Sequence, residues 1–279
     1  MGKGIAIRWV VALEPESIAI RKKYQMTRVA HSGPYPVFKD VADCHWLTIS
    51  GVGRVHAAAA TMYLHQVSSA PPWAGWVNVG IAGHGAGTYG TLYLVDKIIE
   101  KSTGRSGYPG PILSSTLARG SLMTVDKPET NYGNDLLFDM EGSAIFEIAC
   151  RLSCQQLVLV LKIVSDGQNI DVKELTSKMI SDLVSDSISE IINLVGKMEI
   201  LTKKEHDRLE LPVEYYAIKK NWHFSQSLEY RLMHLVKRWQ ATAQNKELMP
   251  YVDECKDAKS VIRKLSIKLD NHEVDWGKS

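Results

Sequence analysis

The sequence contains few cysteines and no long apolar run. Its four cysteines, Cys44, Cys150, Cys154 and Cys255, lack the paired spacing of a zinc site, so we expect no metal centre. Scattered thiols fit a reducing compartment better than a disulfide framework, which predicts a cytoplasmic protein. No apolar run reaches the roughly 18 residues of a membrane span. Arg8 interrupts the short apolar run near the N-terminus, so we expect no signal peptide.

The chain also has little net charge. A formal charge of +2 gives no reason to expect a polyanionic partner, so we do not expect nucleic-acid binding. The hydrophobic fraction of 45% and the charged fraction of 23% are ordinary for a globular protein. The 279 residues suffice for one large α/β domain, or for one domain with an appendage.

Strand-like and helix-like segments alternate through the first part of the chain, and this order predicts an α/β fold. Apolar runs typical of buried strands are followed or separated by segments with helical periodicity. The expected strands are 4–13, 43–53, 76–81, 92–99 and 157–164, and the expected helices begin near Pro15 or cover 54–67, 142–152 and 171–198.

The glycine segment 85–90 matches the GxGxxG pattern, yet it does not predict a dinucleotide site. That motif needs a helix directly after the glycines, because the helix N-terminus holds the pyrophosphate. Here the segment is followed by Leu92–Ile99, which is β-branched and aromatic and reads as a strand. A dinucleotide-dependent oxidoreductase is therefore not expected.

Carboxylates stand at both ends of the segment 138–167. Asp139-Met140-Glu141 comes directly before an expected helix, and Ser165-Asp166 ends the strand that follows it. Open α/β sheets bind ligands beyond the carboxyl ends of their strands, so Asp166 is a candidate site residue. An ordinary amphipathic helix followed by a core strand with solvated ends would give the same pattern.

With the Ala-Leu-Glu-Pro-Glu segment after the first strand and the Ser-Gly-Val-Gly turn before the helix 54–67, this pattern resembles the nucleoside phosphorylase family. The closer resemblance is to the methylthioadenosine/S-adenosylhomocysteine nucleosidases and their hydrolase relatives. It covers residues 1–199 and implies a twisted, mostly parallel or mixed sheet flanked by helices. It also implies cleavage of an N-ribosidic bond through an oxocarbenium-like transition state, without metal or organic cofactor.

The resemblance implies a role for each acidic residue. Glu141 would bind the ribose hydroxyls and Met140 would pack on the sugar. Asp166, oriented by Ser165, would protonate the leaving purine at N7. Glu16 would activate the attacking water, although an acid at this place also suits the positive end of a helix.

Further residues are expected to contact the substrate. These are Ile81, Ala82 and Gly83 at the end of the third strand, Asp139, and Arg54, which is a possible anion contact or a solvated helix-start arginine. Ile81 stands where methylthioadenosine nucleosidases have serine, which indicates a different substrate, as in futalosine-type hydrolases.

Three readings of the function stay open. The glycine segment carries no arginine, and no Gly-Asp-Pro-x-Arg segment is present, which favours water over phosphate as nucleophile. A phosphorylase is the second reading. The third is a nucleoside-binding module without turnover, because Lys127-Pro128 stand where the family has a base-stacking aromatic. Tyr132 is the nearest replacement. The expected partners are a nucleoside and a second copy of the chain, since the relatives nearest in pattern are dimers.

Residues 200–279 have no counterpart in the minimal family and are predicted to form a helical C-terminal extension. Within them, 201–211 is charged and reads as a linker. Helical periodicity covers 214–240 and 253–269.

Overall fold

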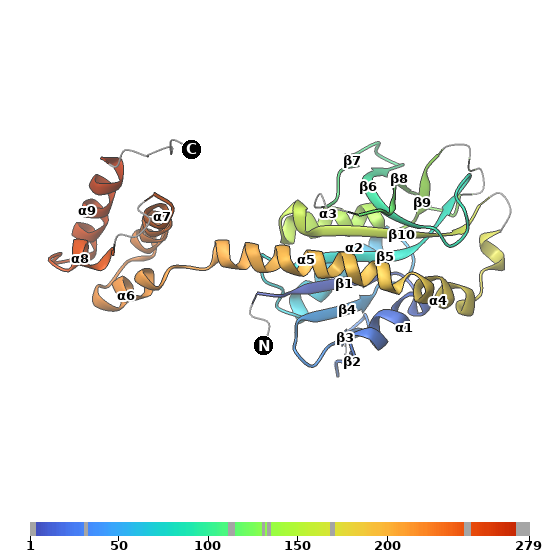
Figure 1. Ribbon diagram of the computed structural model, residues 1–279, viewed down its shortest axis with the longest axis horizontal. Coiled ribbons are helices and arrows are strands. Elements are labelled where there is room, and N and C mark those ends of the chain that lie inside the picture. The colour runs from blue at the N-terminus through green and yellow to red at the C-terminus, as the bar shows by residue number, and fades with distance from the viewer. Residues whose placement is uncertain are drawn as a thin grey trace. The chain divides into compact units, whose positions relative to one another are not determined.

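The expected alternation of strands and helices forms one mixed sheet flanked by helices in the computed structural model, which confirms the predicted fold class (Figure 1). The structure describes residues 4–30, 33–110, 115–129, 132, 135–167, 171–242 and 247–271. The chain divides into two compact units, Met1–Arg208 and Leu209–Ser279. The sequence predicted this boundary at residue 199.

Ten strands of the described part of the chain belong to the sheet. At its centre β5 pairs in parallel with β1 and β10, whose residues are almost all buried, as their apolar runs predicted. The strands are β1 (Ile7–Val11), β2 (Thr27–Arg28), β3 (Val37–Lys39), β4 (His45–Ile49), β5 (Gly75–His84), β6 (Leu92–Glu100), β7 (Ser106–Gly107), β8 (Ala118–Thr124), β9 (Leu137–Asp139) and β10 (Val158–Asp166).

One half of the sheet closes on itself. β5 pairs with β10, β10 with β6, β6 with β8, β8 with β9, and β9 again with β5. Gly83 of β5 is therefore in register with Asp166 of β10 on one side and with Phe138 of β9 on the other. This closure brings segments distant in sequence to one end of the sheet. The glycine segment leads into β6 and not into a helix, so the strand predicted after the glycines is confirmed.

Helices cover both faces of the sheet (Figure 1). One core cluster joins Ile20 of α1 (Glu14–Lys23) to Leu183 of α4 (Ser177–Asp186) and Val195 of α5 (Ile188–Leu209). The other joins Leu64 of α2 (Arg54–Val67) to Ile145 of α3 (Gly142–Leu152). Both α2 and α3 have the predicted bounds.

The predicted single helix 171–198 is wrong. A short 3-10 turn, Val172–Glu174, comes first, and Thr176 then caps α4 by accepting a hydrogen bond from the Met179 N–H. The chain breaks again at Ser187 before α5 begins. The segment 201–211, predicted to be a linker, is helical as far as Leu209, where α5 ends and the second unit begins. Its buried face includes Thr202, so helical packing, and not net charge, decides this segment.

The unit Leu209–Ser279 has its own apolar core, which includes Leu232, Trp239 and Leu265. The predicted helix 214–240 is two helices, α6 (Val213–Asn221) and α7 (Gln226–Thr242). They are followed by α8 (Met249–Val252) and α9 (Ala258–Asp270), and Asp257 caps α9 through the Ser260 N–H. None of the helices within the described ranges is long and apolar enough to cross a membrane.

Candidate active site

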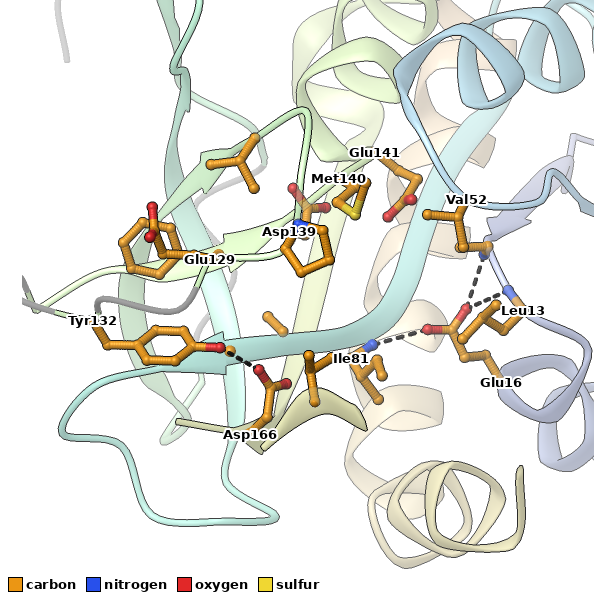
Figure 2. A pocket seen from close by; sticks show the side chains of 17 residues that line it. Leu13, Glu16, Val52, Ile81, Glu129, Tyr132, Asp139, Met140, Glu141 and Asp166 are labelled. Atoms are coloured by element: carbon orange, nitrogen blue, oxygen red, sulfur yellow. Dashed lines mark hydrogen bonds between the residues drawn. The ribbon is translucent and has the colours of Figure 1, made fainter. Parts of the chain in front are cut away.

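A pocket of about 220 Å³ lies at the end of the sheet where β5, β9 and β10 finish (Figure 2). Its walls come from five separate parts of the sequence, which the fold brings together. Five carboxylates line it, and no lysine or arginine is found among its described lining residues. The lining residues are Ala12, Leu13, Glu16, Val52, Ile81, Ala82, Gly83, Val125, Pro128, Glu129, Tyr132, Phe138, Asp139, Met140, Glu141, Asp166 and Val172.

Glu16 reaches the pocket from the first turn of α1 and is only 2% exposed. Its Oε2 accepts hydrogen bonds from the N–H groups of Ala12 (2.9 Å) and Leu13 (2.8 Å). Its Oε1 accepts one from the Ile81 N–H at 3.0 Å, which ties α1 to β5. Burial raises the pKa of Glu16, against the lowering effects of Lys162 and of these backbone N–H groups. The carboxyl is thus held in one orientation and is a stronger base than an exposed glutamate.

Glu141 lies across the pocket at the start of α3 and is 7% exposed. Its Oε1 accepts a hydrogen bond from the Gly53 N–H at 2.7 Å. Gly53 has a φ of 104°, a conformation that favours glycine and turns this N–H toward the carboxylate. Burial and the neighbouring Asp139 raise the pKa of Glu141 to about 7. Its Oε2 takes no hydrogen bond from the described residues and is available to a ligand.

Asp139 and Lys162 form a buried ion pair beneath the pocket, with 2.8 Å between Oδ2 and Nζ. Asp139 also accepts hydrogen bonds from Thr124 Oγ1 (2.7 Å) and from the Gly142 N–H (2.7 Å), so its oxygens are occupied by the protein. Burial lowers the pKa of Lys162, but the opposing effect of Asp139, Glu141 and Glu16 is larger, so the pKa is raised overall. Lys162 therefore carries the positive charge that compensates three buried carboxylates.

Asp166 ends β10 and is 7% exposed. The buried Ser165 donates its hydroxyl to Asp166 Oδ1 at 2.5 Å, and Tyr132 donates its phenol to Oδ2 at 2.5 Å (Figure 2). Both oxygens of the carboxyl are thereby fixed in position. Burial, and then the hydrogen bond to Asp166, raise the pKa of the Tyr132 phenol, which stays protonated and serves as a donor.

The structure brings most of the expected site residues together. Glu16, Met140, Glu141 and Asp166 line one pocket, and so do Ile81, Ala82, Gly83 and Asp139. Ser165 lies behind Asp166 without lining the pocket.

Arg54 is placed elsewhere. Its guanidinium pairs with Glu100 and, at 2.8 Å, with Asp126, and it does not line the pocket. These acidic partners come from β6 and from the loop after β8, so the sequence around Arg54 gave no sign of them. The geometry supports a structural ion pair at Arg54 and no substrate contact.

Solved structures with a similar fold include three nucleosidases. A 5′-methylthioadenosine/S-adenosylhomocysteine nucleosidase from Neisseria meningitidis, in complex with methylthio-immucillin-A, is 18% identical, with a TM-score of 0.56 over 67% of this chain and 98% of that one. The apo 5′-methylthioadenosine nucleosidase of Arabidopsis thaliana is 18% identical, with a TM-score of 0.55 over 68% and 95%. The Helicobacter pylori enzyme with butyl-thio-DADMe-Immucillin-A is 14% identical, with a TM-score of 0.57 over 69% and 98%.

This chain has the fold of the methylthioadenosine/S-adenosylhomocysteine nucleosidases. No protein-family model matches the sequence, and no curated protein matches it. The likeness is therefore one of structure, at sequence identities that establish the nucleosidase fold alone.

Two residues at this site were missed or undervalued in the sequence. Lys162 interrupts an otherwise apolar strand, and a charge inside such a run was a signal that a buried partner exists. Tyr132 was noted only as a substitute for a missing aromatic residue. Its hydrogen bond to Asp166 spans 34 positions of the chain, so no local pattern could predict it.

Proposed function

We propose that the chain is a purine-type nucleoside N-ribohydrolase. The observation that carries this proposal is the meeting of Glu16, Glu141 and Asp166 around one pocket. They come from α1, from the start of α3 and from the end of β10. Cleaving an N-ribosidic bond needs an acid for the leaving base, an acceptor for the sugar hydroxyls and a base for water, and three carboxyl groups can supply these functions.

Asp166 is the proposed acid for the base. A purine leaves readily only when it is protonated, and Asp166 stands at the open end of β10 with its carboxyl aimed into the pocket (Figure 2). Ser165 holds the other oxygen, so the carboxyl plane is set before a substrate binds. A fixed donor avoids the reorganisation that an exposed carboxyl would need at the moment of bond cleavage.

Glu141 is the proposed ribose ligand. Its Oε1 is held by Gly53, and its Oε2 is available to accept hydrogen bonds from sugar hydroxyls. Positive charge develops on the sugar in an oxocarbenium-like transition state, so a carboxylate here stabilises that state more than the ground state. Met140 offers apolar surface beside it.

Glu16 is the proposed base for water. Its carboxyl is held by three backbone N–H groups while it faces the pocket, and its raised pKa favours proton capture. Water is the proposed nucleophile because the described lining residues include no lysine or arginine that could bind a phosphate ion.

Chromatographic detection of free base tests the proposal. The panel contains methylthioadenosine, S-adenosylhomocysteine, adenosine and inosine, each with and without phosphate. We expect base release without phosphate, and a loss of about a hundredfold or more in Asp166→Asn. Asp96→Asn, an exposed acid on β6, is the matched control and should keep the wild-type rate. A requirement for phosphate, with ribose 1-phosphate as product, would indicate a phosphorylase instead.

A nucleoside-binding module without turnover is the second candidate. The observation that favours it is the hydrogen bond from Tyr132 to Asp166, which engages the proposed acid within the protein. Binding of adenosine without base release, in the wild type and in Asp166→Asn alike, would support this function and contradict the hydrolase.

We also propose a homodimer in a reducing, cytoplasmic compartment. The outer face of α2 supports the dimer, because Val55, which is 82% exposed, and Met62, which is 49% exposed, lie two turns apart on the same side of the helix. Sedimentation of the wild type and of Met62→Glu tests the dimer, and a monomeric wild type would rule it out.

The four cysteines are free thiols, which fits the proposed reducing compartment. Localisation of a tagged chain tests that assignment.

A further inference from the structure

The ring of Tyr132 lies directly on the backbone of Gly83. A Cβ at Gly83 would come within 2.6 Å of Tyr132 Cε1 and 2.8 Å of its Oη. It would also come within 2.7 Å of Asp166 Oδ2. Only a residue without a side chain permits an aromatic ring this close to the end of β5.

The same ring presents its polar atom to Asp166. The phenol donates to Oδ2 at 2.5 Å, and the opposite wall is Phe138, whose ring meets that of Tyr132 at 71° with 5.7 Å between centroids. A flat aromatic ring therefore lies over Gly83, contacts Phe138 and forms a hydrogen bond with the proposed acid. A base that takes its proton from Asp166 must make the same contact with the carboxyl.

We infer that Tyr132 occupies the base subsite of the ligand-free chain and is displaced when a nucleoside base binds. The inference rests on the proposed function, since it takes Asp166 as the group that contacts the base. The Tyr132 ring already lies against Gly83 and binds Asp166 Oδ2. A purine ring cannot take the same position on Gly83 and the same oxygen of Asp166 while Tyr132 stays there. Tyr132 therefore competes with the base for the same contact with Asp166.

The contacts of Tyr132 indicate how strongly it competes. Its hydroxyl is bonded to a buried acidic group, while the residue itself is only partly buried. Displacement exchanges this hydrogen bond for one to the base and moves the phenol into water. Removing the hydroxyl should therefore tighten base binding by about tenfold, the upper range for the contribution of one hydrogen bond.

Tyr132→Phe is the test, because it removes the hydrogen bond and keeps the ring. Calorimetry with adenine as the probe measures base binding directly, and the base-release assay supplies KM and kcat. We expect the Kd for adenine and the KM to fall about tenfold. Tyr132→Ala, which also removes the ring, should lower the Kd at least as far. Tyr108→Phe removes the hydroxyl of an exposed tyrosine that does not line the pocket, and it should leave both constants unchanged.

The outcomes separate this inference from the proposed function. Base release by the wild type with an unchanged or raised KM and Kd in Tyr132→Phe overturns the inference and leaves the hydrolase standing. Tighter adenine binding by Tyr132→Phe without base release by either protein supports the inference and contradicts the hydrolase. Adenine binding by none of the variants overturns the inference.

Discussion

The stability of Glu141→Gln relative to the wild type should increase as the pH rises. Burial and Asp139 raise the pKa of Glu141 from 4.5 to about 7. Between these values the folded protein holds a proton that the unfolded chain releases, so wild-type stability falls as the pH increases through this window. The glutamine variant carries no such titrating group. The difference between the two proteins therefore isolates the cost of ionising this one carboxyl.

The size of this effect follows from the raised pKa. One pKa unit corresponds to about 1.4 kcal/mol, so the free energy of unfolding of Glu141→Gln relative to wild type should rise by about 2 to 3 kcal/mol from pH 5 to pH 8. Any constant loss from a weaker hydrogen bond to Gly53 cancels in this comparison. Burial also raises the pKa of Glu16, and that contribution cancels as well, because both proteins contain Glu16.

Thermal unfolding at the two pH values measures the change. At about 2 to 4 °C per kcal/mol for a domain of this size, the Tm difference should grow by about 5 to 10 °C. Glu147→Gln is the matched control, since it removes the same charge from the exposed face of α3 and should show no such growth. A Tm difference between Glu141→Gln and wild type that stays flat or shrinks from pH 5 to pH 8 would refute the reasoning. Base release should be lost in Glu141→Gln, so stability and activity would move in opposite directions.

Three further changes test other parts of the structure. Lys162→Met should destabilise the fold by about 3 to 5 kcal/mol, because it leaves the buried Asp139 without its ion-pair partner; denaturant titration measures this. Gly53→Ala should cost about 1 kcal/mol or more at a φ of 104° and raise the KM, as measured by denaturation and by base release. A chain ending at Glu210 should unfold in one transition and keep the wild-type rate of base release, because the two units have separate cores. Loss of cooperative unfolding and of base release would show that the first unit needs the second.

Local patterns carried much of the prediction. The helices 54–67 and 142–152 were predicted to the residue, because their apolar periodicity is a short-range property of the chain. The end of β10 could be placed by the same means, since an apolar run that stops at Ser165-Asp166 identifies a strand end. Where helices break, the prediction was poorer. The interruptions at Ser187 and after Asn221 leave the periodicity nearly intact, and packing decides them.

The sequence by itself determined the identity and order of the acidic residues, the elements that carry them and the α/β class of the fold. Only the tertiary structure decided their partners. Gly53 reaches Glu141 across 88 positions, Arg54 pairs with Glu100 and Asp126, and Tyr132 bonds to Asp166. These contacts depend on the closure of the sheet through β5, β9 and β10. Periodicity reports the few residues around each position, whereas closure is set by pairing between strands far apart in the chain.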